Sequence, residues 1–279
     1  MKNGMRCSVG VIQILALLFL VSPLHAEETG GSSAGDLAKK SQNPVADMIS
    51  LPLQYNAYFN TGPEGNRTQD VLLIQPVMPI SLNDAWNFIA RPIIPVLNQP
   101  GYSPGQDREY GVGNVQFQGF FSPKDEVGGW ILGVGPYFEF PTNCNPDNRF
   151  GSDNSSIGPA LVALQIKGPW VYGGLVTQLW SYAGPDPEVN TTAIQPFVNY
   201  NLDDGWYLTT GPTIIANWSA ADSDDRWTIP VGGGIGKIFH LGKQPVNAKV
   251  AGYYNVEAPR SAGDWQLQFQ LQFLFPKGQ

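Results

Sequence analysis

Four glutamines near the end of the chain occupy alternate positions: Gln266, Gln268, Gln270 and Gln272. Their amide groups both donate and accept hydrogen bonds without carrying charge. The odd positions of residues 265–275 are Trp, Leu, Phe, Leu, Phe and Phe. This period of two predicts a strand with one polar and one apolar face. The chemistry of the polar face is hydrogen bonding to water or a solute.

The same alternation in other segments predicts more inward-facing polar side chains. Beside the four glutamines, the candidates for lining a lumen are Gln54, Asn56, Arg91, Gln116, Gln118, Glu139, Asn199, Lys249, Asn255 and Glu257. The charged members are two bases and two acids, so the charges are near balance. An ion-selective pore usually presents a ring of one sign, and the pattern therefore favours neutral or weakly polar solutes.

The sequence has few residues of the kinds that acid–base catalysis, nucleophilic catalysis or metal binding would need. Beyond residue 26 the chain has one histidine, His240, and one cysteine, Cys144. A Ser–His hydrolase would have a single candidate base and no serine placed by a motif, and a zinc site needs three or four ligands. The acidic runs 147–153 and 222–225 lack the spacing of a calcium loop. The sequence predicts no enzyme, no metal and no cofactor.

Twelve segments of 10 to 14 residues carry the alternating character and must position these side chains. They are residues 51–60, 70–80, 85–97, 110–121, 129–140, 157–167, 169–181, 192–202, 205–218, 226–239, 245–257 and 264–275. The connections between them alternate strictly between long polar ones and short ones. Transmembrane barrels have this asymmetry, because one rim has tight periplasmic turns and the other has longer extracellular loops. An even number of strands places both termini on the periplasmic side.

The spacing of aromatic residues supports the predicted barrel, whereas the prolines inside its segments are an objection to it. Residues 265–275, tilted about 40°, would rise roughly 25 Å along the membrane normal, which is the height of an outer-membrane apolar band. Lys237 has the lipid-facing parity near a short turn, where its side chain can reach the interface. Seven prolines fall inside segments, where each removes a ladder hydrogen bond and suggests a bulge: Pro76, Pro92, Pro136, Pro159, Pro196, Pro212 and Pro230.

The bulk composition and the N-terminus agree with export. The 279 residues carry a net charge of −7 and are only 14% charged, against about 25% in soluble domains. The acidic balance argues against nucleic-acid binding. Residues 1–26 resemble a signal peptide cleaved after Ala26, with an uncleaved anchor helix as the alternative. Residues 27–50 are predicted to be a periplasmic linker with a possible short helix, and residues 51–279 the barrel.

Two stretches, SQNPVADMISLPLQYN at 41–56 and IQPVMPISLNDAWNFIARPIIPVL at 74–97, carry a family resemblance. They resemble a bacterial family named outer-membrane transporters of the meta-pathway of phenol degradation, whose members are sometimes misnamed neuromedin U. The resemblance extends over most of residues 41–275, and the strand prolines belong to it. It implies an outer-membrane barrel and suggests small aromatic compounds as solutes, and it transfers no catalytic or binding residue.

We therefore expect an all-β, single antiparallel transmembrane barrel of about 12 strands in the bacterial outer membrane. Its expected function is passive or facilitated diffusion of small neutral or aromatic solutes. The alternatives are a soluble periplasmic β-sandwich binding module and a structural barrel without transport, and an enzyme of outer-membrane lipids is the least favoured. The expected partners are outer-membrane lipids, a small solute, and the assembly machinery through the C-terminal strand.

Overall fold

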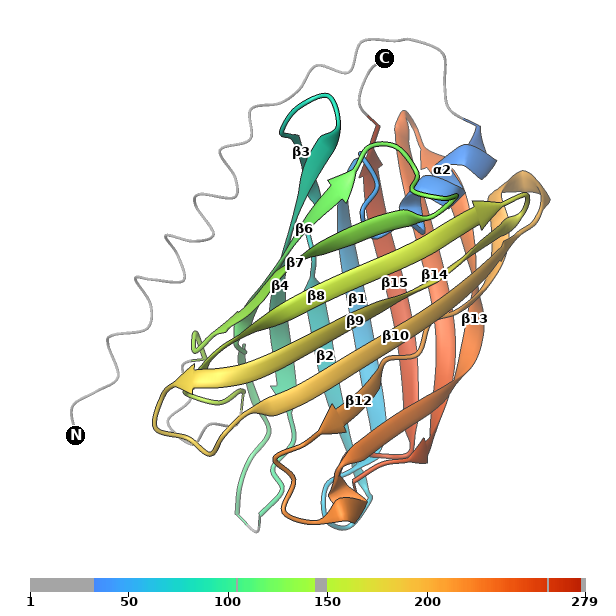
Figure 1. Cartoon of the computed structure of the whole chain (residues 1–279). Helices are drawn as coiled ribbons and strands as arrows, with labels where there is room; N and C mark the ends of the chain where they lie inside the picture. Colours follow the sequence, from blue (N-terminus) through green and yellow to red (C-terminus); the bar gives the residue numbers. More distant parts are fainter. Residues whose placement is uncertain (1–32, 104, 144–149, 260, 277–279) are drawn as a thin grey trace.

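The computed structural model describes residues 33–103, 105–143, 150–259 and 261–276. The predicted signal peptide at 1–26 and Cys144 lie outside the described residues. One antiparallel sheet contains all the strands and closes on itself as a barrel (Figure 1). The first strand of the barrel pairs with the last, so the sheet has no free edge there.

The strands follow the predicted segments closely. They are β1 (Ile49–Thr61), β2 (Arg67–Ile74), β3 (Met78–Ser81), β4 (Trp86–Gln99), β5 (Glu109–Val112), β6 (Val115–Pro123), β7 (Ile131–Phe140), β8 (Ser155–Lys167), β9 (Trp170–Ala183), β10 (Asn190–Asn201), β11 (Trp206–Thr210), β12 (Ile214–Asn217), β13 (Trp227–Leu241), β14 (Gln244–Glu257) and β15 (Trp265–Phe275). Three short helical elements accompany them: α2 (Ala34–Ser41), η1 (Asp203–Gly205) and η2 (Ser223–Asp225).

Fifteen strands make twelve crossings, because three crossings are interrupted. The interrupted crossings are β2 with β3, β5 with β6, and β11 with β12; β11 and β12 both pair with β10 and with β13. The antiparallel twelve-stranded barrel predicted from the sequence is confirmed. The prediction that residues 70–80, 110–121 and 205–218 are each continuous is wrong.

Proline explains two of these breaks and one bulge. Pro76 lies between β2 and β3, and Pro212 lies between β11 and β12. Pro230 lies where the register of β13 against β14 shifts. A residue without an N–H weakens the ladder, so breaks and bulges are where proline is tolerated. Pro136 and Pro159 instead pair directly with each other inside continuous strands.

The two ends of the barrel differ as predicted. Turns of two to seven residues follow β3, β6, β8, β10 and β13, whereas the connections at the opposite end have five to fourteen residues. Short turns mark the periplasmic rim of an outer-membrane barrel. Figure 1 shows α2 at the end of the barrel that carries the β13–β14 turn, which is the periplasmic end.

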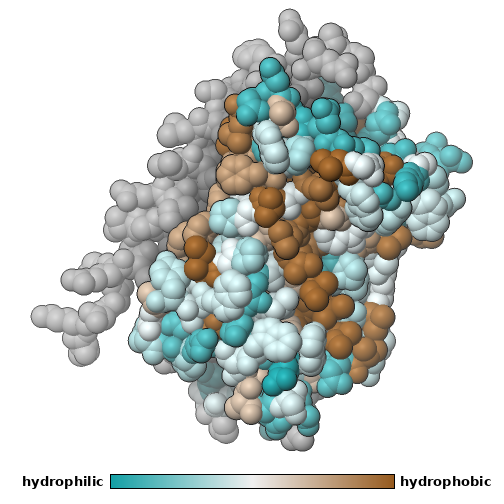
Figure 2. All heavy atoms as spheres, in the orientation of Figure 1, coloured by the Kyte–Doolittle hydropathy of each residue, from teal (hydrophilic) through white to brown (hydrophobic). Residues whose placement is uncertain are grey.

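The outer wall is apolar and ends in aromatic girdles. Between the polar ends, hydrophobic side chains cover much of the visible wall in Figure 2. All eight tryptophans lie near strand ends: Trp86, Trp130, Trp170 and Trp206 at the periplasmic end, and Trp180, Trp218, Trp227 and Trp265 at the extracellular end. Amphipathic rings at both ends of an apolar band mark the two membrane interfaces.

The terminal strand has the two faces that its sequence predicts. Phe269 is 46% exposed on the outer wall, whereas Gln272 is 4% exposed inside the barrel. Gln268 is likewise buried. The apolar odd positions of β15 therefore face lipid and its glutamines face the interior.

Candidate functional site in the barrel lumen

The segment that precedes β1 enters the barrel at its periplasmic end. Ser33 caps α2, since its hydroxyl oxygen accepts a hydrogen bond from the Asp36 N–H at 3.1 Å. Asp36 lies in the first turn, and Lys39 and Lys40 lie in the last turn. Each charge complements the helix dipole, so the sequence favours a helix here although it is only eight residues long.

Apolar side chains hold the segment against opposite walls of the lumen. Leu37 packs in one buried cluster with Ile238 of β13 and Leu274 of β15. Val45 belongs to another cluster with Phe120 of β6 and Val162 of β8. Residues 33–48, which we call the N-terminal segment, therefore cross the lumen from the β13 wall to the β6–β8 wall.

Polar contacts fix the same segment. Gln42 and Asn201 exchange two amide hydrogen bonds, at 2.9 and 3.2 Å. The Asn247 amide donates to the Ser41 hydroxyl at 3.3 Å. The segment thus adds hydrogen bonds to two wall amides that also donate to Pro169 and Gln272 of the barrel.

A cavity of about 180 Å³ lies between the N-terminal segment and the polar wall of the lumen. Its lining combines amides, hydroxyls, a few apolar side chains and three bases. The predicted lumen residues found there are Gln54, Arg91, Asn199, Lys249, Gln270 and Gln272. The structure adds residues from the N-terminal segment and neighbouring strands, among them Lys40, Ser41, Gln42, Asn43, Met48, Gln75, Phe197, Tyr207 and Asn247.

The charge of this cavity differs from the balance expected for the whole lumen. Arg91, Lys249 and Lys40 line it, and none of its described lining residues is an aspartate or glutamate. The Nε and Nη1 atoms of Arg91 are buried and have no hydrogen-bond partner among the described residues. The charge at this point is positive.

A second group of predicted residues forms an amide network on the extracellular side of the cavity. Asn56 Oδ1 accepts hydrogen bonds from the amides of Gln54, Gln266 and Gln268, at 3.2, 3.0 and 3.1 Å. Gln272 donates to the Ser50 hydroxyl at 3.1 Å. Side chains of β1 and β15 are therefore linked across the closure of the barrel.

The predicted acidic residues lie apart from the cavity. Glu139 accepts hydrogen bonds from Gln116 at 2.8 Å and from Asn114 at 3.4 Å, and the Tyr137 hydroxyl donates to Gln116 at 2.7 Å. Glu257 is exposed at the extracellular end of β14 and does not line the cavity, so its place in the lumen stays a prediction.

The two remaining candidates also lie outside the cavity. Asn255 donates to the Gly263 carbonyl at 2.8 Å, in the connection after β14. Gln118 of β6 is 5% exposed and pairs with Arg91 of β4 in the register of the two strands.

Sequence reasoning missed the contribution of the N-terminal segment and of Tyr207. Tyr207 is buried, and its hydroxyl donates to Asn247 Oδ1 at 2.7 Å. The available signal was the apolar pattern of Val45, Ala46 and Met48 directly before the first strand. Such a pattern in a periplasmic linker indicates that the linker is packed against something.

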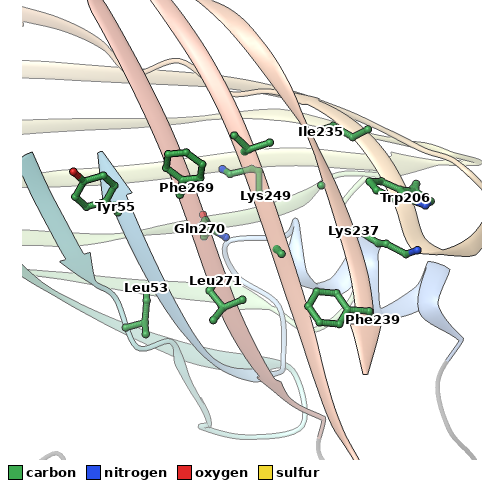
Figure 3. Close-up of a pocket in the computed structure, with 13 residues that line it drawn as sticks. Leu53, Tyr55, Trp206, Ile235, Lys237, Phe239, Lys249, Phe269, Gln270 and Leu271 are labelled. Atoms are coloured by element: carbon green, nitrogen blue, oxygen red, sulfur yellow. The ribbon is translucent and has the colours of Figure 1, made fainter. Parts of the chain in front are cut away.

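A second hollow, of about 590 Å³, lies on the lipid side of the wall (Figure 3). Phe239, Ala248 and Phe269 are among the residues that line it. Lys237 lies on this outer face, as predicted, with Nζ 4.6 Å from the centroid of the Trp206 ring. This cation–π contact places the charge at the periplasmic tryptophan girdle, where it is tolerated.

His240 lies exposed near the end of β13. Among the described residues, no group of three or more His, Cys, Asp and Glu side chains could hold a metal ion. No helix in the described part of the chain is long and apolar enough to cross a membrane.

Solved structures resemble this barrel. An outer-membrane channel from Pseudomonas putida F1 aligns over 82% of this chain and 96% of its own, at 16% identity and a TM-score of 0.61. The NanC porin aligns over 82% of this chain and 100% of its own, at 9% identity and a TM-score of 0.50. The chain has the fold of an outer-membrane β-barrel. No protein-family model and no curated protein matches the sequence.

This fold and the two tryptophan girdles confirm the predicted location in the outer membrane. The outer wall of the barrel is in contact with lipid, because its exposed side chains are apolar and aromatic over the height of the band.

Proposed function

We propose that the protein is a channel for small solutes, aromatic compounds among them, and that the N-terminal segment controls its periplasmic end. The observation that carries this proposal is the polar cavity between the segment and the wall. Twelve strands enclose more space than eight, whose interior is filled by side chains, and less than the sixteen of a wide porin. A narrow path that a segment of sixteen residues can close fits this size.

The more specific part of the proposal is that aromatic solutes pass through the channel. It rests on the resemblance to the transporters of the meta-pathway of phenol degradation, and on the presence of Phe197, Met48 and Val77 beside the amides in the cavity. The Pseudomonas putida protein of the same fold is also named a channel.

The remaining assignments follow from the same proposal. The chain is not an enzyme, which the scarcity of acid–base groups supports. The proposal includes the division of the chain into a signal peptide at 1–26, a linker at 27–50 and a barrel at 51–279. It also includes recognition of the C-terminal strand by the assembly machinery.

Swelling of liposomes that contain the purified protein tests the channel. Deleting residues 33–46 removes the contacts of Leu37, Gln42 and Val45, so uptake of small neutral solutes should rise at least several-fold over the full chain. Absence of uptake by both proteins would reject the channel. It would favour a structural barrel, which the extensive packing of the N-terminal segment against the lumen walls makes the second candidate.

A reversible lock separates segment movement from other effects of a deletion. A Cβ built on Gly133 would lie 3.0 Å from Cγ1 of Val45, the atom that a cysteine sulfur would replace, and 2.8 Å from Cγ1 of Val162, which would have to shift. In a Cys144→Ser background, Val45→Cys with Gly133→Cys should lower uptake when oxidised and restore it on reduction. The Cys144→Ser protein alone is the control and should not respond to the reductant.

A further inference from the structure

Two lumen bases have no acidic partner. The side chains of Arg91 on β4 and Lys249 on β14 make no ion pair and no hydrogen bond among the described residues, and both line the lumen cavity. Glu139, a carboxylate on β7, accepts its hydrogen bonds from Gln116 and Asn114 instead. No described acidic residue therefore compensates the positive charge at the cavity.

An uncompensated charge in a partly desolvated interior is costly, and an anion that pairs with it lowers the free energy. The guanidinium of arginine presents parallel N–H donors that match the two oxygens of a carboxylate. Lysine adds a second, point-like charge. An arginine and a lysine on one cavity are suited to a small monoanion with two equivalent oxygens.

The rest of the lining suits an organic body. Phe197, Met48 and Val77 provide apolar surface, and Gln54 and Gln270 provide neutral amides. The volume of about 180 Å³ is below the range of about 300–1,000 Å³ that is usual for drug-sized ligands. A ligand with one ring or a short chain fits these limits better than a larger one.

We propose that the lumen cavity is a binding site for a small organic carboxylate, with Arg91 and Lys249 on the carboxylate and Phe197 and Met48 against the apolar part. This inference rests on the proposed channel function and names its class of solute. Lys40, exposed at the end of α2, adds positive charge at the mouth. The site attracts a carboxylate from the lumen and holds it between the N-terminal segment and the polar wall.

Equilibrium binding of three isosteric probes to the full-length protein in detergent tests the site. Benzoate, benzamide and benzamidine share one shape and carry negative, zero and positive charge. Benzoate should bind about tenfold or more tightly than benzamide, since charge-assisted hydrogen bonds exceed neutral ones, and benzamidine should not bind. Equal affinities for benzoate and benzamide would overturn the proposal.

Variants locate the binding. Arg91→Gln and Lys249→Gln should each weaken benzoate binding about tenfold and leave benzamide binding unchanged, and Arg91→Lys should have an intermediate effect. Lys167→Gln removes an exposed charge from the end of β8 and is the control, with no expected effect. Heat-modifiable migration on gels establishes that each variant is folded. Wild-type benzoate affinity in a folded Arg91→Gln protein would overturn the assignment.

Two further arms separate this proposal from related ones. Inorganic phosphate that displaces benzoate at equal concentration would reduce the cavity to a general anion site and overturn the assignment to organic acids. Benzoate binding without solute uptake, even after deletion of residues 33–46, would reject the channel and support the site. Uptake with no preference for benzoate over benzamide would support the channel and reject the site.

Discussion

The two halves of the barrel interior are built from different residues. On the side of β4 and β6–β9, the inward side chains include Ile89, Phe120, Leu164 and Val171, and they pack into one buried cluster with Val45. On the side of β14, β15 and β1, the inward side chains are mostly amides and hydroxyls joined by hydrogen bonds. The cavity lies along this polar half and extends to Arg91 of β4 and to residues of β10 and β11.

This division separates stability from solute handling. The interior of a twelve-stranded barrel is wider than that of an eight-stranded one, whose inward side chains fill it. In this protein, one half of the interior is packed with apolar side chains like the core of a soluble protein. The filled half contributes apolar burial, while the polar half leaves room and offers hydrogen bonds. Substitutions in the two halves should therefore differ in size and in the property that they change.

The largest expected effect is on stability in the apolar half. Phe120 is fully buried in the interior cluster, so Phe120→Ala should lower the free energy of unfolding by about 3–5 kcal/mol. Urea unfolding of the protein in lipid vesicles measures this change.

The neighbouring residue provides a matched control. Phe121 is 43% exposed on the outer wall, where lipid replaces much of the lost contact, so Phe121→Ala should cost less than half as much. Equal losses for the two alanine variants would mean that the interior cluster is not a packed core, and the contrast between the halves would fail.

The same contrast explains which lumen residues could be predicted from the sequence. In β15 every second residue is glutamine, so the alternation identifies the inward face directly. In β9 the inward residues Val171, Leu175 and Leu179 are as apolar as the outward Val176. Alternation carries no signal where core and lipid require the same side chains.

Other features depend on contacts between distant parts of the chain. The breaks at Pro76 and Pro212 follow from proline chemistry, but their effect on the ladder depends on neighbouring strands. Entry of residues 33–48 into the lumen depends on clusters formed with β6, β8, β13 and β15. The charge of the cavity likewise depends on which inward side chains this segment leaves accessible.

An intermediate effect is expected where the polar half meets the N-terminal segment. Tyr207→Phe removes the donor to Asn247 Oδ1 and leaves a buried acceptor without a partner, which should cost about 1–3 kcal/mol in the same unfolding measurement. Tyr254→Phe is the control, because Tyr254 lies on the outer wall at 43% exposure and should change stability little. A loss for Tyr254→Phe as large as that for Tyr207→Phe would show that burial inside the polar half is not the cause.

The smallest effect on stability is expected inside the cavity itself. Gln270 lines the cavity and makes one long hydrogen bond, 3.3 Å, to Gln272. Gln270→Ala should therefore change the free energy of unfolding by no more than about 0.5–1 kcal/mol. It should enlarge the cavity and raise the swelling rate of liposomes with neutral one-ring solutes when residues 33–46 are also deleted.

Gln268→Ala is the matched control on the same strand, because Gln268 is buried and donates to Asn56 outside the cavity. This substitution should lower the free energy of unfolding more than Gln270→Ala and leave uptake unchanged. Faster uptake through Gln268→Ala than through Gln270→Ala would place the path away from this cavity and along the amide network instead.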